Sequence, residues 1–434
     1  MTGVLAPLLV LAATAACREP RVRADAGLSP ARPARPAGCR DVGPTEPLQA
    51  MIDDPGVAAI CLQAGSYAGP LVIGRGVTVW GPPDAIVRAR RPGSTIAITG
   101  SGGVLLGLTI DGSGGRFDQT DAAVRVTGRD IRVEGVTVIE AMFGILVDNG
   151  VHVQIVGNRV HGGRDPAVGL RGDTIRLWET TGSVVEANVV EDGRDLVVWY
   201  SRGNRIVGNE VRRGRYGLHF MYSHDNDVGH NRLLDGTVGI FVMYSRGLDI
   251  HDNLIAGAGG AAGIAIGLKE SGNIRVRRNR LLHDTTGLYI DASPLQLGDR
   301  VDVEGNTLEL DDRGIVFHAS GHRVAVRDND FADNQTQVQV DGGGDALDVT
   351  WTGNYFDDYE GYDLDGDGRG DVPYEARSLS GELTSSHPGL ALFRGTPALA
   401  LVDAAAHLDP LFQPRAILTD TTPRMTARPI EVAP

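Results

Sequence analysis

The fold is decided by a repeat that is clearest over residues 184–233, which read VVEANVVEDGRDLVVWYSRGNRIVGNEVRRGRYGLHFMYSHDNDVGHNRL. In each unit an asparagine has an apolar residue three positions before it and another two positions after it, as in Ile206-Val-Gly-Asn209-Glu-Val211. The unit returns roughly every 21 to 30 residues, a period typical of stacked repeats. Its asparagines are Asn158, Asn188, Asn209, Asn231, Asn253, Asn279, Asn306, Asn329 and Asn354.

The spacing within the unit indicates a corner between two short strands. Inward side chains of a straight strand recur every two positions, so apolar residues three before and two after the asparagine do not fit one strand. A unit of about 22 residues is also too short for a helical hairpin repeat or a propeller blade, and it matches one coil of a parallel β-helix. We therefore predict an all-β, right-handed parallel β-helix over residues 39–356.

The asparagines themselves are predicted to be structural. Identical side chains stack on one another in a solenoid, so the amides can hydrogen-bond along the column as amide ladders do in other stacked β structures. This pairing satisfies a polar group at each corner that would otherwise cost about 1–3 kcal/mol to bury. Leu108 and Val136 stand at the equivalent positions upstream, so the early coils are expected to have an apolar corner.

The overall composition restricts the function. The chain has 434 residues, which a solenoid can accommodate as one domain because its repeats grow by stacking. The formal net charge is -14, which argues against nonspecific nucleic-acid binding. Aromatic residues make up only 5% of the chain, so stacking platforms for bases or sugars are not evident.

The N-terminal residues 1–17 read as an export segment. The apolar run from Val4 to Ala16 is about as long as a signal peptide's core and too short to span a bilayer comfortably. Small residues precede Cys17, as in a bacterial lipoprotein processing site, so we expect either lipidation of Cys17 or an ordinary cleaved signal. Residues 18–38 are rich in Pro, Ala and Arg and are predicted to be a linker.

Two cysteines remain in the exported part of the chain. In an exported protein an even number of cysteines favours a disulfide, here between Cys39 and Cys61. Such a bond would secure the N-terminal end of the solenoid, where the first coil lacks a neighbour. Two buried free thiols are the alternative.

Residues 357–375 contain the most distinctive local motif, an Asp-rich loop reading DLDGDGRGD from residue 363 to residue 371. Alternating carboxylates with glycines provide converging oxygens around a hard cation. Tyr374 stands where an EF-hand loop has a bidentate Glu, so we predict a calcium-binding turn rather than a complete EF-hand; a solvated acidic turn is the alternative. The predicted ligands are Asp363, Asp365, Asp367 and Asp371.

A second candidate site is a column of soft and aromatic side chains. One coil apart stand Trp178, Trp199, Met221 and Met243, followed at the next position by Tyr200, Tyr222 and Tyr244. His219 lies two residues before Met221 and is expected on the same side of its strand. Thioethers and imidazole are suitable ligands for copper, so His219, Met221 and Met243 are candidate copper ligands. The alternative is that the column only packs one face of the solenoid.

A carbohydrate-binding or carbohydrate-cleaving enzyme is the competing interpretation, because long solenoid faces suit polymers. Catalysis of this kind needs paired carboxylates. The acids Asp192, Asp195, Asp225 and Asp291 are scattered over different columns, and Lys269 is the single lysine of the chain. We therefore expect a protein that is not an enzyme, with a polysaccharide lyase, hydrolase or epimerase as the alternative.

Several segments resemble the NosD family of periplasmic maturation proteins for nitrous oxide reductase, over roughly residues 65–425. They read RDLVVWYSRGN (194–204), RYGLHFMYSHDN (215–226), GIFVMYSRG (239–247), TTGLYIDASP (285–294), GNYFDDYEGYDLDGDGRGDVPY (353–374) and HPGLALFRGTPALALVDAAAHLDPLFQP (387–414). The resemblance implies a pectate-lyase-type β-helix that works with the permease and ATPase subunits of an ABC-type transporter. It also implies a role in denitrification, in which a copper-chaperone lipoprotein hands over copper for the tetranuclear copper-sulfide site of the reductase.

The C-terminal segment, residues 376–434, loses the solenoid pattern. Apolar residues from Leu390 to Leu408 suggest short amphipathic helices interrupted at Pro397 and Pro410. We expect this segment to cap the last coil, whose edge would otherwise be open, and to contact the transporter permease.

Overall fold

A computed structural model describes residues 30–89, 92–163, 165–319, 321–342, 344–377, 379–393, 396–408 and 414–429. The predicted export segment with Cys17, and the linker up to residue 29, lie outside the described residues. No helix in the described part of the chain is long and apolar enough to cross a membrane.

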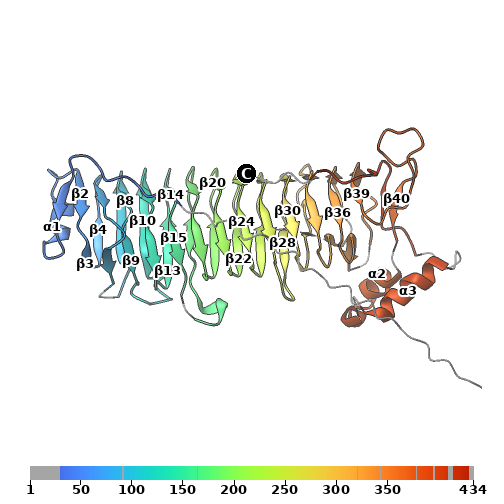
Figure 1. The fold of residues 1–434 in the computed structure, drawn as a ribbon, viewed down its shortest axis with the longest axis horizontal. Helices are drawn as coiled ribbons and strands as arrows, with labels where there is room; N and C mark the ends of the chain where they lie inside the picture. The colour runs from blue at the N-terminus through green and yellow to red at the C-terminus, as the bar shows by residue number, and fades with distance from the viewer. Residues whose placement is uncertain are drawn as a thin grey trace, which may run out of the picture.

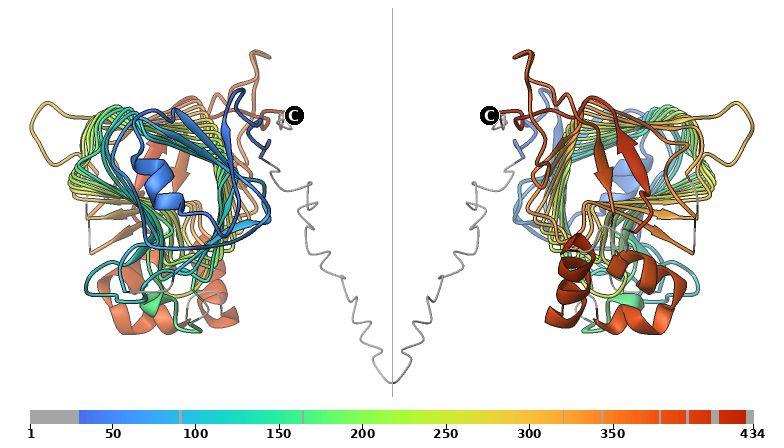
Figure 2. Two further views of the ribbon diagram at one scale, coloured as in Figure 1. Left: turned by 90° about the vertical axis from the view of Figure 1, so that its left-hand side faces the viewer. Right: turned by 90° about the vertical axis from the view of Figure 1, so that its right-hand side faces the viewer.

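The chain winds into three long parallel sheets, each of which receives one strand per coil (Figure 1). Strands that pair are three elements apart in sequence over most of the solenoid, so each coil bonds to the coils before and after it. The two end views of Figure 2 look along this stack. The parallel β-helix predicted from the asparagine period is therefore confirmed.

Sheet 1 has 14 strands: β1 (Arg40–Val42), β2 (Ala59–Leu62), β5 (Thr78–Trp80), β8 (Val104–Leu106), β11 (Arg132–Glu134), β14 (Gln154–Val156), β17 (Val184–Glu186), β20 (Arg205–Val207), β23 (Asp227–Gly229), β26 (Asp249–His251), β29 (Ile274–Arg277), β32 (Val301–Glu304), β35 (Val324–Arg327) and β38 (Thr350–Thr352). Sheet 2 has 13 strands: β3 (Gly65–Ala68), β6 (Ala85–Arg88), β9 (Thr109–Asp111), β12 (Thr137–Ile139), β15 (Arg159–His161), β18 (Val189–Glu191), β21 (Glu210–Arg212), β24 (Arg232–Leu234), β27 (Leu254–Ala256), β30 (Arg280–Leu282), β33 (Thr307–Glu309), β36 (Asp330–Ala332) and β39 (Tyr355–Phe356). Sheet 3 has 12 strands: β4 (Leu71–Ile73), β7 (Ile96–Ser101), β10 (Ala122–Arg129), β13 (Phe143–Asp148), β16 (Ile175–Trp178), β19 (Asp195–Trp199), β22 (Tyr216–Met221), β25 (Val238–Met243), β28 (Ile264–Lys269), β31 (Leu288–Asp291), β34 (Ile315–His318) and β37 (Val338–Asp341).

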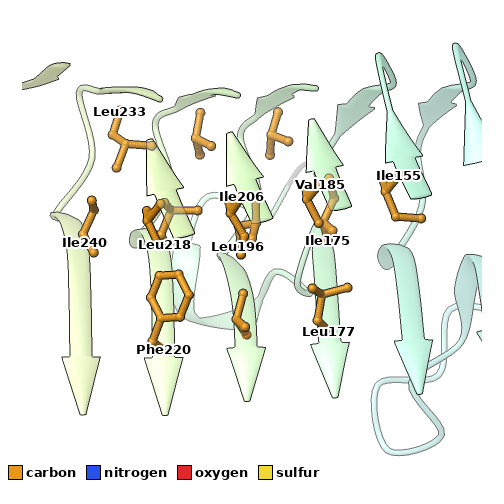
Figure 3. Packing of buried hydrophobic residues seen from close by; sticks show 14 of the residues in the cluster. Ile155, Ile175, Leu177, Val185, Leu196, Ile206, Leu218, Phe220, Leu233 and Ile240 are labelled. Atoms are coloured by element: carbon orange, nitrogen blue, oxygen red, sulfur yellow. The ribbon is translucent and has the colours of Figure 1, made fainter. Parts of the chain in front are cut away.

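The core is a set of aliphatic columns that run the length of the solenoid. Ile155, Val185 and Ile206 occupy equivalent positions on successive strands of sheet 1 and are fully buried (Figure 3). Leu218 and Phe220 extend the same core from sheet 3. Each such side chain contributes about 1.5–3 kcal/mol through burial, so the stacking of coils stabilises strands that mostly have only three to six residues.

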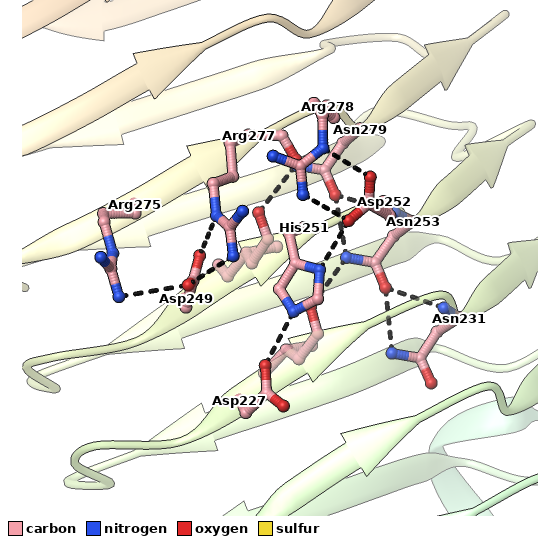
Figure 4. A network of polar contacts seen from close by, with 12 residues as sticks. Asp227, Asn231, Asp249, His251, Asp252, Asn253, Arg275, Arg277, Arg278 and Asn279 are labelled. Atoms are coloured by element: carbon pink, nitrogen blue, oxygen red, sulfur yellow. Dashed lines mark hydrogen bonds and ion pairs between the residues drawn. The ribbon is translucent and has the colours of Figure 1, made fainter. Parts of the chain in front are cut away.

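The asparagines form a continuous ladder at the corner between sheets 1 and 2. Each Nδ2 donates to the Oδ1 of the next asparagine at 2.8 to 3.0 Å, and each also donates to a backbone carbonyl. Three rungs, Asn231, Asn253 and Asn279, are visible in Figure 4. Leu108 and Val136 are fully buried at the equivalent corner of earlier coils, as predicted. The residue before each asparagine has a positive φ, for example His230 at 56°, which makes the sharp bend.

Different elements close the two ends of the solenoid. Helix α1 (Leu48–Asp53) lies across the first coils and buries Leu48 and Ile52. Cys39 and Cys61 form a disulfide there, with Cα atoms 5.7 Å apart. At the other end, β40 (Tyr374–Ala376) and β41 (Leu418–Asp420) form a small antiparallel sheet that covers the last coil. Tyr374 and Leu418 belong to the main hydrophobic core.

The C-terminal helices lie beside the last coils rather than over their open edge (Figure 1). They are α2 (Leu379–Ser386), the 3-10 helix η2 (Pro388–Phe393) and α3 (Pro397–Leu408). Residues of α2 lie close to β37, whereas β41 lies against β38. The helices predicted for this segment are therefore present. The last coil, however, is covered by β40 and β41 of the same segment rather than by these helices.

Part of the predicted linker belongs to the surface of the solenoid. Residues 30–38 lie along the corner between sheets 1 and 2, where the Trp80 Nε1 donates to the Pro33 carbonyl oxygen at 3.1 Å. Gly107 and Gly135 provide room for Pro33, because a Cβ at Gly135 would lie 2.4 Å from its ring. The proline of this segment therefore packs against small residues at the corner of the solenoid. The Pro-rich composition alone did not predict this contact.

Candidate functional site

The soft and aromatic column predicted from the repeat is in register on the outer face of sheet 3. The strand pairing places Trp178 beside Trp199, Trp199 beside Met221, and Met221 beside Met243. Leu218 and Phe220 of β22 point into the core, so His219 and Met221 point outward, since successive side chains of a strand alternate. The structure thus brings the three candidate copper ligands, His219, Met221 and Met243, to one face of two adjacent strands.

Three tyrosines border this face at the turn that follows each strand. Tyr200 stacks on Tyr222 at 5.3 Å and Tyr222 on Tyr244 at 4.9 Å, with rings inclined by 11° and 16°. Tyr200 and Tyr222 are more than 40% exposed. A buried chain of hydrogen bonds through the serines of successive turns fixes their position: the backbone N–H of Ser201 donates to Ser223 Oγ, and that of Ser223 to Ser245 Oγ.

His219 is enclosed by this aromatic face. Its ring stacks on Tyr216 at 4.6 Å and meets Trp199 edge-on at 5.3 Å. Neither imidazole nitrogen has a hydrogen-bond partner among the described residues, although the side chain is only 7% exposed. Burial lowers the pKa of His219 to about 4, so the ring is neutral near pH 7. A buried imidazole whose two nitrogens lack a protein partner is unfavourable for stability unless a water, an ion or a ligand pairs with them.

The carboxylates nearest to this face are held by arginines. Asp173 accepts from Arg194, with 2.6 Å between Oδ1 and Nη2, and Asp195 accepts from Arg215. Both side chains are at most 3% exposed. Burial raises the pKa of Asp173, against the attraction of Arg194. The pair is therefore a buried ionic network and lacks the open access that an acid and a base for polymer cleavage require.

The Asp-rich loop brings together three of its four predicted ligands. Carboxylate oxygens of Asp363, Asp365 and Asp367 lie within 4.8 Å of one another. Asp371 instead accepts the backbone N–H of Leu364 at 2.6 Å. Hydrogen bonding by the Gly368 N–H lowers the pKa of Asp363. The loop is thus preorganised by its own backbone, and calcium binding remains a prediction.

A third cluster was not predicted from the sequence. His230, His251 and Asp252 each offer a ligand atom within 4.8 Å of the others, and Figure 4 shows His251 and Asp252 of this cluster. His230 comes immediately before one asparagine of the ladder, Asn231, and His251-Asp252 come immediately before the next, Asn253. Alignment of the repeats by their asparagines therefore places these histidines on adjacent coils.

Comparisons with known proteins identify relatives by sequence. A family model described as "Periplasmic copper-binding protein (NosD)" matches residues 151–361. The chain is 28% identical over 366 residues to a "Probable ABC transporter binding protein NosD" of Stutzerimonas stutzeri, covering 79% of this chain and 81% of that protein. The protein of the same description from Pseudomonas aeruginosa is 28% identical over 387 residues, covering 79% and 82%.

Solved structures with a similar arrangement include carbohydrate-active β-helix proteins. The A-module of the mannuronan C-5 epimerase AlgE6 of Azotobacter vinelandii has a TM-score of 0.47 at 14% identity, covering 70% of this chain and 93% of that one. A polygalacturonase of Erwinia carotovora has a TM-score of 0.45 at 14% identity, covering 74% and 96%.

The matched region contains the aromatic and thioether face of sheet 3 and the whole asparagine ladder, and it ends at residue 361, before the predicted ligands of the Asp-rich loop. Both curated relatives extend the match to about four-fifths of the chain. The family model and the two relatives thus show that the chain is similar in sequence to the NosD family.

Proposed function

We propose that this protein is a periplasmic, non-catalytic accessory protein for the maturation of nitrous oxide reductase, and that it receives and passes on copper in cooperation with an ABC-type transporter. The observation that supports this proposal is the outer face of sheet 3, where the neutral His219 and the paired Met221 and Met243 lie within an aromatic surround. Thioether and imidazole ligands suit Cu(I), and a site of this kind releases its ion more readily than a thiolate site.

The two cysteines of the solenoid are not available as copper ligands. Cys39 and Cys61 are joined to each other, so neither offers a thiolate to copper. Copper held by His219, Met221 and Met243 is then the cargo of the protein. A copper-chaperone lipoprotein is the proposed donor and the tetranuclear copper-sulfide site of the reductase the proposed destination.

Cu(I) competition titrations test the ligands directly. Met221→Leu with Met243→Leu removes both thioethers while keeping volume and hydrophobicity, and should abolish one equivalent of bound Cu(I). Met142→Leu is the matched control, because Met142 also packs on sheet 3 but against a separate cluster around Phe143. Equal Cu(I) binding by the double variant and the wild type would eliminate this site.

The function in the cell is tested by the copper content of nitrous oxide reductase. Deletion of the gene should leave the catalytic copper cluster of the reductase unloaded, and complementation with the double methionine variant should restore it poorly. Full loading of the reductase in the deletion strain would contradict the maturation role.

The helical segment is the proposed contact with the transporter permease. Leu392, Phe393 and Leu401 are 88%, 51% and 70% exposed on η2 and α3. Leu392→Glu with Leu401→Glu should abolish co-purification with the permease and leave Cu(I) binding unchanged. Leu297→Glu is the control, because Leu297 is also a strongly exposed leucine (96%) but lies in a loop of the solenoid. Loss of co-purification in both the double variant and the control would show a nonspecific effect of charge.

Binding of a polysaccharide is the second candidate, favoured by the stack of Tyr200, Tyr222 and Tyr244. Aromatic rings spaced by about one coil provide a flat surface for sugar rings. Turnover or tight binding of uronate polymers, lost in Tyr222→Ala, would support this candidate.

The lipid anchor at Cys17 is a separate proposal, tested by whether globomycin blocks processing of the precursor.

A further inference from the structure

The corner between sheets 1 and 2 carries a group of side chains that the proposed copper transfer does not use. His230 and Asp252 occupy the bend residues before Asn231 and Asn253, at φ values of 56° and 53°. His251 is the last residue of β26, which pairs with β23. Because the asparagines of the ladder point inward, the bend residues before them are directed to the outside of the solenoid.

Gly229 provides the space in which the His251 ring lies. A Cβ at Gly229 would stand 2.4 Å from Cε1 and 2.7 Å from Nε2 of His251, so any larger residue would displace the imidazole. In this position the Nε2 of His251 lies 2.8 Å from an oxygen of Asp227, and its Nδ1 lies 2.7 Å from an oxygen of Asp252. The ring is therefore fixed from three sides, and its side chain is only 13% exposed.

The second imidazole faces this arrangement from the neighbouring coil. The ring of His230 meets that of His251 at 5.5 Å and at 89°. Ligand atoms of His230, His251 and Asp252 lie within 4.8 Å of one another, close enough to converge on one ion after small rotations of the side chains. Histidines that bind metals donate their other ring N–H to a carboxylate, which is the relation of His251 to Asp227.

Arg278 controls the charge of this group. It forms a bidentate ion pair with Asp252, at 2.8 and 2.7 Å. One carboxylate is thus partly neutralised, and the remaining donors are two imidazoles and one oxygen. This set suits a borderline transition-metal ion rather than calcium or magnesium, which require more oxygen ligands.

The position of the group along the corner is also distinctive. The N-terminal segment lies against the corner as far as Gly157, where Pro30 packs, and the C-terminal segment lies along it as far as Gly305 and Asn306, where Arg428 binds. His230 is exposed on a coil between these two stretches. Among the described residues, the cluster is on the open part of a corner that both terminal segments otherwise occupy.

We propose that His230, His251 and Asp252 bind a divalent transition-metal ion of the Zn²⁺ or Cu²⁺ type, with Asp227 as the positioning residue that holds the His251 ring. Three protein ligands leave an outward coordination position free for water or for a group of a partner protein. The site lies on a different face from His219, Met221 and Met243 and does not depend on the proposed copper transfer.

Calorimetric titration of the purified full-length protein with Zn²⁺ alone, and separately with Cu²⁺ alone, tests the proposal. His230→Asn should weaken binding of one equivalent at least tenfold, and asparagine tolerates the positive φ of this position. His283→Asn is the matched control, because His283 is another exposed histidine at a bend, with φ of 58°, outside the cluster. Unchanged affinity in His230→Asn, or equal loss in both variants, would overturn the proposal.

Two further variants separate ligation from folding. Asp227→Asn should weaken binding about tenfold or more without removing a ligand, as expected for the residue behind a metal-bound histidine. His251→Asn should abolish the Cu²⁺ signal in electron paramagnetic resonance that has two nitrogen ligands. The Met221→Leu and Met243→Leu variant should retain this site, so failure of the Cu(I) proposal and failure of this one give different results.

Discussion

Asp420 terminates the asparagine ladder by accepting two hydrogen bonds from Asn354. Its Oδ2 lies 3.0 Å from the backbone nitrogen and 2.8 Å from the Nδ2 of Asn354, and its Oδ1 accepts from the backbone of Gly353 and Thr422. Asp420 is fully buried on β41. A carboxylate is the one side chain of this size that can accept from four donors and has none of its own.

Replacing Asp420 by Asn should therefore destabilise the solenoid although the size is unchanged. An amide at position 420 directs an NH₂ group at N–H donors, so part of the end of the ladder loses its acceptor at a cost of about 1–3 kcal/mol. Urea unfolding followed by circular dichroism measures this effect. Asp348→Asn, at an exposed aspartate, is the control. Equal stability of Asp420→Asn and the wild type would contradict the role of Asp420 as the terminal acceptor.

A second polar column should make stability depend on pH. At the turns after sheet 2, the backbone N–H of Asp284 donates to Asp311, and that of Asp311 donates to Asn334. Burial raises the pKa of Asp311 to about 8 and also raises that of Asp284. The folded state therefore binds more protons than the unfolded state between about pH 4 and pH 8, and stability should fall as pH rises through this range.

Asp311→Asn should reduce this decline, because an amide accepts from Asp284 without ionising and can donate as Asn334 does to the Leu308 carbonyl. At pH 8 the variant should be more stable than the wild type by about 1–3 kcal/mol. Thermal unfolding at pH 5, 6.5 and 8 measures the slope. Asn334→Asp should make stability fall more steeply as pH rises. A wild-type stability that is constant from pH 5 to pH 8 would contradict the expected effects of both variants.

His219 should contribute a pH dependence of the opposite sign. Burial lowers its pKa to about 4 from an unfolded value of 6.5, so the unfolded state binds more protons between these limits, and stability should fall as pH falls from about 7 to about 4. His219→Phe should remove this loss and raise the melting temperature, because the two unpaired nitrogens disappear. A lower melting temperature in His219→Phe would indicate that the imidazole serves packing.

His219→Phe should at the same time weaken Cu(I) binding if the imidazole is a ligand. A variant that is more stable and binds less copper would separate the role of the side chain in binding from its role in the fold. Tyr289→Phe, at the equivalent register position three coils further on, controls for general changes of the face.

Calcium should raise the melting temperature if the Asp-rich loop binds it. Binding to the folded state alone adds about 2.7 kcal/mol at a hundredfold excess over the dissociation constant. Asp365→Asn should abolish the shift, whereas Asp371→Asn should reduce it less, because Asp371 is engaged with Leu364. The loop transmits this effect to the end of the solenoid through Arg369, which donates to the Thr422 carbonyl. The same melting curve with calcium and with a chelator would count against the site.

The sequence by itself determined the scaffold, because a strictly periodic chain can satisfy its asparagines only by stacking them. The rungs from Asn158 to Asn354, the apolar corners at Leu108 and Val136, and the alignment of Trp199, Met221 and Met243 all follow from one register. Local spacing carries this information, since each side chain interacts with its counterpart one coil away.

Only the tertiary structure showed the contacts that lie outside the repeat pattern. Asp420 meets Asn354 across 66 residues, Pro33 lies against Gly135, and the His251 ring lies in the space above Gly229 between Asp227 and Asp252. These contacts join nonrepeating segments to the solenoid, or depend on side-chain directions at a corner. Their physical basis is the pairing of buried polar groups and the filling of particular gaps, which no spacing in the chain specifies.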